Sequence, residues 1–132
     1  MIAFEPFAGV SQKDFIDNEK EVVKDNMKAM LAQSKIEMQR FKPSGEVYYL
    51  QEACEKLFNA FELYVSYVSG QRLYSHQSMY KLAKSNIKNL IRSANDLHRF
   101  FYNAQNEMPI EEATKIYYKI YNKIKPLINR IN

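Results

Sequence analysis

The sequence predicts an all-α fold, an antiparallel up-down bundle of four to five helices. Its 132 residues include only 3 glycines and 4 prolines, too few for the many turns of an all-β protein. In two long stretches apolar residues recur at alternating intervals of three and four, the pattern of helices that bury one face. Long helices with short connections favour an antiparallel bundle. A chain of this length fits a single domain, residues 1–132, whose core needs no disulfide or metal.

The first helix is expected over residues 12–40, after an irregular arm formed by residues 1–10. Ser11 and Asp14 resemble a capping box, which starts a helix. A break at residues 42–45, Lys-Pro-Ser-Gly, should end it because the residue before proline avoids the α conformation. The expected core face consists of Ile16, Val23, Met27, Met30 and Ser34, followed by Met38 or Phe41.

The second helix should begin after Ser44, which can act as its N-cap, and continue to about Ser69. Its apolar residues form a heptad seam: Val47, Leu50, Cys54, Leu57, Phe61, Tyr64 and Val68. Three further residues widen the seam: Ala53, Phe58 and Val65. The single cysteine, Cys54, cannot form an intrachain disulfide, and its place on the seam predicts a buried small hydrophobe.

A third, short helix over residues 76–84 should follow Gly70, with Ser75 as its cap. The fourth is expected from Ser85 or Asn86 to about Asn103, either separate from the third or joined to it by a kink. Its apolar stripe is Leu90, Ala94, Leu97 and Phe101.

The last helix should have Pro109 at its first position, and Pro126 should kink it or end it one turn early. Its seam is Ile110, Ala113, Tyr117, Ile120, Ile124, Leu127 and Ile131. Lys115, Lys119 and Lys123 form a basic row on the same helix.

No metal site or cofactor motif is visible in the sequence. The two histidines, His76 and His98, are far apart and stand in no cluster at metal-ligand spacing. Glu52, Glu55 and Glu62 have helical spacing, but a di-iron bundle needs a Glu-x-x-His segment, which this chain lacks. We therefore expect these acids to be surface charges, and we expect neither a metal nor a cofactor.

The net charge of +4 is unevenly distributed. Residues 1–26 carry −3, residues 27–69 are neutral and residues 70–132 carry +7. A basic half favours contact with phosphates, although lysines also simply keep exposed helix faces soluble. The sequence shows neither a secretory leader nor an apolar run long enough to span a bilayer, so we expect a cytoplasmic protein without a membrane partner.

The candidate site lies within residues 90–102, LIRSANDLHRFFY. His98 borders the apolar stripe, and an imidazole can transfer a proton at neutral pH. Arg92 could stabilise charge on a phosphate, so the two groups together could cleave RNA without a metal. Six positions on a helix separate them by about 120°, so they would converge only through an irregular turn or a second subunit. Four polar residues of the same helix could bind a ligand: Lys88, Asn95, Arg99 and Tyr102. The alternative is that His98 is a boundary residue beside a solvated basic face.

These residues resemble a known family. Arg92-x5-His98 fits the R-x4–6-H signature of the HEPN superfamily, and residues 97–102 resemble the L-H-x-N-F-Y segment of its small archaeal PaREP-type branch. Residues 51–57 resemble the Q-x-A-E-K helix of that branch, and Ser75-His76 resembles the S-H that opens its next helix. The resemblance covers about residues 47–130, in the same order.

The resemblance implies a homodimeric bundle of four or five helices. In active members, the arginine and histidine of both subunits face each other and cleave RNA, within toxin–antitoxin and other defence systems and often beside a minimal nucleotidyltransferase. Other members act as binding or assembly modules. Ser93 and Phe100 differ from the active pattern, and the tyrosine that some toxins have two residues after the histidine is missing. We therefore expect a HEPN-like dimer that binds RNA or a nucleotide, or that serves assembly. A metal-independent ribonuclease is the first alternative and a purely structural dimer the second.

Overall fold

The computed structural model describes residues 12–69, 85–103 and 108–131. All regular structure in these ranges is α-helical, with no strand, which confirms the predicted all-α fold. The helices are α1 (Gln12–Ser44), α2 (Val47–Ser69), α4 (Ser85–Asn103) and α5 (Ile110–Asn129). The predicted N-terminal arm, the Ser11 capping box and the short helix over residues 76–84 lie outside the described residues.

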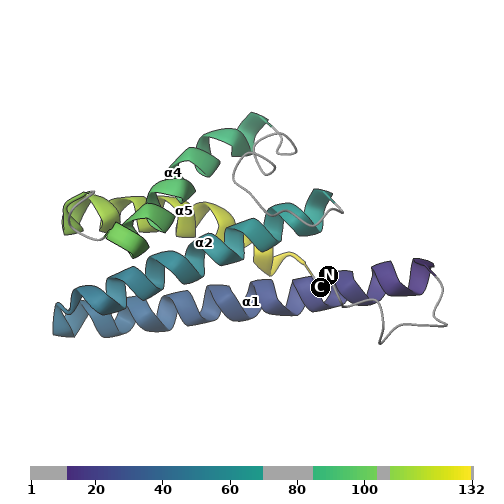
Figure 1. The fold of residues 1–132 in the computed structure, drawn as a ribbon, viewed down its shortest axis with the longest axis horizontal. Helices are drawn as coiled ribbons and strands as arrows, with labels where there is room; N and C mark the ends of the chain where they lie inside the picture. Colours follow the sequence, from purple (N-terminus) through teal and green to yellow (C-terminus); the bar gives the residue numbers. More distant parts are fainter. Residues whose placement is uncertain (1–11, 70–84, 104–107, 132) are drawn as a thin grey trace.

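The helix α2 is central to the bundle, because it packs against α1, α4 and α5. α1 and α2 run antiparallel along each other, and α4 and α5 lie on the other side of α2 (Figure 1). α1 also supplies core residues, among them Met27, which belongs to the core face expected for the first helix. The core includes Met27 and Leu31 of α1, Leu57 and Phe61 of α2, Leu97 and Phe100 of α4, and Tyr117 and Ile120 of α5.

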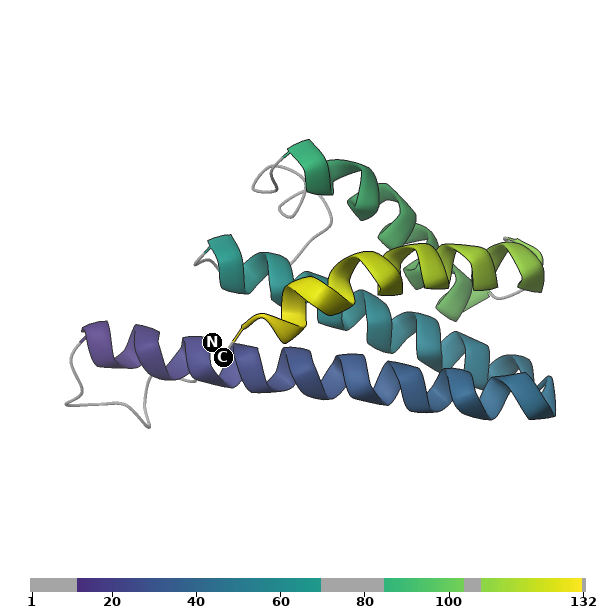
Figure 2. The same cartoon turned by 180° about the vertical axis from the view of Figure 1, so that it is seen from behind.

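The C-terminal end of α5 returns to α1 (Figure 2). There the Lys28 ammonium donates a hydrogen bond to the Ile131 carbonyl oxygen. Nearer the N-terminal end of α1, Lys20 places its ammonium 5.0 Å from the centre of the Tyr67 ring of α2. No helix in the described ranges is both long and apolar enough to cross a membrane.

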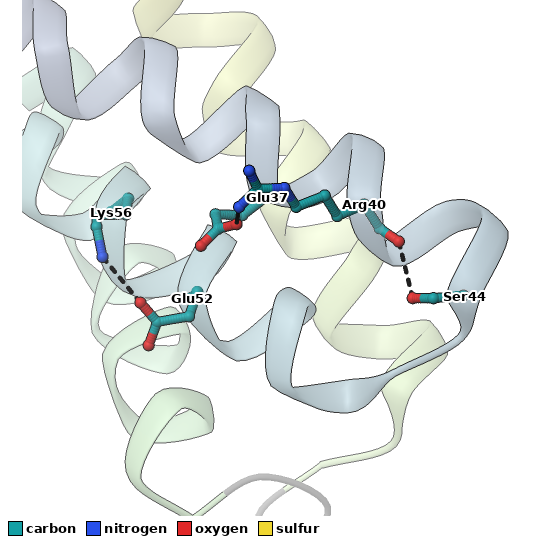
Figure 3. Close-up of polar contacts among 5 residues, drawn as sticks. All are labelled: Glu37, Arg40, Ser44, Glu52 and Lys56. Atoms are coloured by element: carbon teal, nitrogen blue, oxygen red, sulfur yellow. Dashed lines mark hydrogen bonds and ion pairs between the residues drawn. The ribbon is translucent and has the colours of Figure 1, made fainter.

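The first helix ends at Ser44, four residues later than predicted, with Pro43 inside its last turn. Local hydrogen bonds hold this turn despite the proline. The Ser44 hydroxyl donates to the Arg40 carbonyl at 2.7 Å (Figure 3). Gly45, at φ +67°, donates its N–H to the Phe41 carbonyl at 2.8 Å, the left-handed termination that favours glycine. Ser44 therefore ends α1 and does not occupy the N-cap position of α2, although its Oγ accepts the N–H of Glu46, the residue directly before α2, at 3.1 Å.

Most of the predicted α2 seam is buried, from Leu50 to Tyr64, but Val68 is 54% exposed. Straight α-helices rotate by about 20° per heptad relative to an exact seven-residue repeat. By the last turn this rotation has moved Val68 out of the core and left Val65 buried instead. Cys54 is buried, as predicted.

The same rotation changes the end of α5, where Ile128 is fully buried and Leu127 only partly. The helix continues past Pro126 to Asn129, so of the two predicted effects of this proline, a kink or an early end, the early end does not occur. Pro126 removes the hydrogen bond to the carbonyl four residues earlier, at Asn122. Both residues are exposed, so water can satisfy that carbonyl. Pro109 is the N-cap residue and not the first helical residue.

The helix α4 has the predicted bounds, and Leu90, Ala94 and Leu97 are buried. At its end Phe100 is fully buried and Phe101 only partly, the reverse of the expected stripe. Phe100 follows Ser93 by two turns and therefore shares the flank that faces α5. Phe100 is accordingly one of the core residues.

Candidate functional site

Three sides of the helix α4 have different surroundings: one is exposed to solvent, one faces α2 and one faces α5. The helix is unbroken from Ser85 to Asn103, so the spacing of its residues sets their directions. Arg92 and Arg99, seven positions apart, differ by only about 20°, and both side chains are exposed. His98 lies about 120° from Arg92 on one side, and Ser93 about 100° from it on the other.

The His98 flank faces α2. The imidazole Nδ1 lies 2.9 Å from Glu55 Oε1, with side chains that are 35% and 16% exposed, respectively. The same ring stacks on Phe58, with centroids 4.6 Å apart and an interplanar angle of 29°. One turn along, Gln51 donates its side-chain N–H to the Phe101 carbonyl at 2.9 Å. These contacts show that α2 and α4 run antiparallel, since later residues of α2 meet earlier residues of α4.

The glutamates of α2 are not the surface charges that the sequence predicted. Glu52, 19% exposed, pairs with Lys56 at 2.9 Å (Figure 3). Glu62 is half-buried, and burial raises the pKa of its carboxyl. The charge of Glu55 raises the pKa further and that of His98 lowers it. Two carboxyl groups therefore make the surroundings of His98 acidic, because the interior face of α2 meets α4 there. In the described ranges, no group of three His, Cys, Asp or Glu residues has a geometry that could hold a metal ion.

The pairing of His98 with Glu55 defines what this imidazole can do. When neutral, its Nδ1–H can donate to the carboxylate, which leaves Nε2 as a proton acceptor. A carboxylate fixes a catalytic histidine in the same way in serine hydrolases. Cys54, next to Glu55, is not a candidate nucleophile, because burial raises the pKa of its thiol and the Glu55 charge raises it further.

The Ser93 flank faces α5. The Lys119 ammonium donates to the Ser93 hydroxyl at 3.1 Å, in an exposed position. Ser93 directly follows Arg92, so this contact brings the basic row of α5 beside the arginine face of α4. Residue spacing alone could not reveal this junction.

The remaining predicted site residues lie around the same helix. Asn95 is partly buried, and Arg99 lies 3.7 Å from Asp96 in an exposed pair. Lys88 is one turn before Arg92, and Tyr102 one turn after His98; their backbones belong to α4, but their side chains lie outside the described residues.

The structure thus divides the candidate site into two parts: His98 with its partners on α2, and the exposed arginines beside the contact between Ser93 and Lys119. The irregular turn that would bring Arg92 to His98 within one chain is absent, because α4 is regular between them. Glu55 and Phe58 were missed as partners of His98. A sequence signal was available, since Gln51, Glu55, Phe58 and Glu62 follow intervals of four, three and four beside the buried seam.

Searches against protein-family models, curated proteins and solved structures find no significant match to this chain.

Proposed function

We propose that the protein is a HEPN-like helical module that binds RNA or a nucleotide through the exposed face of α4 and acts as a homodimer. The supporting observation is the shared, exposed direction of Arg92 and Arg99, beside the Lys119–Ser93 contact. Guanidinium groups bind phosphate oxygens in a bidentate fashion. Lys88 belongs to the same face by its helical spacing.

Two further residues of α4 could contact the bases or sugars of the ligand in addition to its phosphates. The Asn95 amide can exchange hydrogen bonds with a base or sugar. The Tyr102 phenol is of the type on which unstacked RNA bases stack. The HEPN resemblance adds a setting in toxin–antitoxin or other defence systems, with a minimal nucleotidyltransferase as protein partner. A neighbouring gene for such an enzyme is the expected sign of that setting.

The binding proposal is tested by fluorescence anisotropy of labelled single-stranded RNA at several salt concentrations. Arg92→Gln should weaken binding and reduce the slope of log affinity against log salt by about 0.7, the loss of one phosphate contact. Lys35→Gln is the matched control, because Lys35 is exposed on α1, which packs against α2 and α5. Equal effects of the two substitutions, or the absence of binding by the wild type, would contradict the proposal.

The second candidate, a metal-independent ribonuclease, is favoured by the 2.9 Å contact between His98 and Glu55. Nε2 of His98 would take the proton of a ribose 2′-hydroxyl, whose oxygen would attack the adjacent phosphorus. The bond to the 5′-oxygen would break, that oxygen would take up a proton from water, and His98 would return its proton to the solvent. Arg92 would have to come from a second subunit, since the two residues of one chain point about 120° apart.

The ribonuclease candidate is tested by measuring RNA cleavage in the presence of EDTA. Active protein should leave 2′,3′-cyclic phosphate ends, and His98→Ala or Arg92→Ala should each lower the rate by about 10²-fold or more. Mixed dimers of the two inactive variants should regain part of the activity, because one composite site per dimer keeps both groups. Failure of this complementation would exclude a site shared between subunits.

We place the binding module ahead of the nuclease. Ser93 and Phe100 differ from the pattern of active members, and the carboxyl groups of Glu55 and Glu62 oppose the approach of a phosphate to His98. A purely structural dimer is the outcome if neither binding nor cleavage is measured.

A further inference from the structure

We propose that α5 extends the phosphate-binding face of α4, so that the ligand is a polynucleotide strand and not a mononucleotide. The extended surface, here called the basic face, consists of Arg92 and Arg99 of α4 with Lys115, Lys119 and Lys123 of α5. This inference rests on the proposed function, and it identifies which of the two proposed ligands the protein takes.

The lysines of the basic face form a line along α5. Lys115, Lys119 and Lys123 follow one another at intervals of four, and all three are exposed. Arg130, also exposed, lies seven positions beyond Lys123 and close to the same direction. From Lys115 to Arg130 the line covers about 22 Å at the rise of an α-helix. The opposite side of α5 is buried and consists of Tyr117, Ile120, Ile124 and Ile128. Because that side faces the core, the line of lysines faces solvent.

The two rows of the basic face meet at Lys119. Its ammonium contacts the Ser93 hydroxyl, a neutral group, so the contact leaves its positive charge uncompensated. Within the ranges that the structure describes, no carboxylate lies within ion-pair distance of Lys119 or Lys123. The acids of α5, Glu111 and Glu112, stand in its first turn. The positive charge of α5 therefore accumulates beyond that turn, while on α4 the Asp96 carboxylate lies 3.7 Å from Arg99.

A line of separate cations fits a ligand with regularly repeated anions. A mononucleotide carries its phosphates at one end and can engage only a small part of the basic face. A polynucleotide presents one phosphate per residue, and each lysine or arginine contact adds to its affinity without reading its sequence. An anionic membrane fits less well. An interfacial helix needs an exposed apolar side, and the apolar side of α5 is buried in the bundle.

Titrations with a mononucleotide, a short RNA oligonucleotide and one long enough to cross both helices test this inference. Affinity should increase with length. The double substitution Lys119→Gln, Lys123→Gln should reduce the salt slope for the long oligonucleotide by about 1.4, two single-strand phosphate contacts. The same variant should leave the weak binding of the mononucleotide unchanged. Lys35→Gln is again the control, and circular dichroism verifies that each variant is folded.

The outcomes separate the inference from the proposed function. If Arg92→Gln weakens RNA binding while the double lysine variant binds as the wild type does, the basic face is restricted to α4 and this inference fails alone. If no RNA of any length binds, both proposals fail. If phosphatidylserine vesicles bind and the lysine variant releases them while RNA affinity is unchanged, the face serves a membrane and the inference is overturned.

Discussion

Glu62 illustrates how burial alters one side chain beside His98. Burial raises the pKa of its carboxyl above the ordinary value of 4.5, and the negative charge of Glu55 adds to this effect. The folded state therefore holds a proton on Glu62 more tightly than the unfolded state does. Wherever the native state binds more protons, stability decreases as pH rises.

Glu62→Gln should accordingly stabilise the protein at neutral pH. The destabilisation by Glu62 begins as pH rises through its ordinary pKa and is complete above its raised folded pKa, whereas glutamine does not ionise. Thermal unfolding near pH 7.5 should show the variant with the higher midpoint, and about pH 4 the difference should shrink. Glu46→Gln, at an exposed position, is the control. A difference that is the same at both pH values would contradict this account.

A second residue-scale feature is the buried polar contact between α1 and α5. Ser34 Oγ donates to the Ala53 carbonyl at 3.1 Å, so the Tyr117 hydroxyl is the donor in its 2.8 Å contact with Ser34. Burial raises the pKa of the Tyr117 phenol, which keeps this donor protonated. The contact links three helices through one hydroxyl.

Ser34→Ala should cost about 1–3 kcal/mol, because it leaves the buried Tyr117 hydroxyl without its partner. Tyr117→Phe should cost about 1 kcal/mol, the net value of one hydrogen bond. The double variant should cost less than the sum of the two, since the residues share one interaction. Urea unfolding of all three variants measures this coupling, and strictly additive costs would argue against it.

At the scale of elements, α2 makes the most extensive contacts with the other described helices. Leu57 of α2 and Leu97 of α4 are both fully buried. The contacts of His98 with Glu55 and Phe58 lie at the same α2–α4 interface. The packing of this interface therefore positions the imidazole.

Leu57→Ala and Leu97→Ala should each cost about 2–5 kcal/mol, as large-to-small changes do in a packed core. Val68→Ala is a suitable comparison: Val68 is also an apolar residue of α2, but it is 54% exposed. Its cost should stay within about 0.5 kcal/mol. Chemical denaturation gives the three values, and a cost below about 1 kcal/mol at either leucine would mean that its site collapses around the smaller side chain.

For the whole molecule, the main expectation is the homodimer with α4 at or near the interface. The aromatic run Phe100, Phe101 and Tyr102 would favour such an interface, because aromatic residues are enriched at interfaces. Phe100 is now seen to be buried within its own chain, so it offers no surface to a partner. The dimer expectation therefore depends on the HEPN resemblance and on the separation of Arg92 from His98.

Light scattering at micromolar concentration should give twice the chain mass of 15.6 kDa. A dimer is required if Arg92 and His98 of different subunits form one catalytic site. A particle of 15.6 kDa would leave the basic face available for RNA but would rule out the shared nuclease site. Such a particle would also contradict the homodimer of the proposed binding module, whereas a dimer agrees with both proposed functions.

The sequence by itself determined the helical class and the bounds of α4, because the three-four spacing of apolar residues is a local property of the chain. It also determined that Cys54 is buried and that Arg92 and His98 point about 120° apart, since helical geometry relates spacing to direction. These features depend on residues close in the sequence.

Only the tertiary structure decided which flank of each helix meets which neighbour. The pairing of Glu55 with His98 and the contact of Lys119 with Ser93 each join residues of two different helices. The burial of Phe100 likewise depends on how the helices pack together. A seven-residue pattern also does not show where a row of apolar residues on a straight helix rotates away from the core. Val68 and Leu127 lie at such positions. The physical reason is that packing angles and helix rotation are set by the shapes of all contacting side chains together, which no local spacing contains.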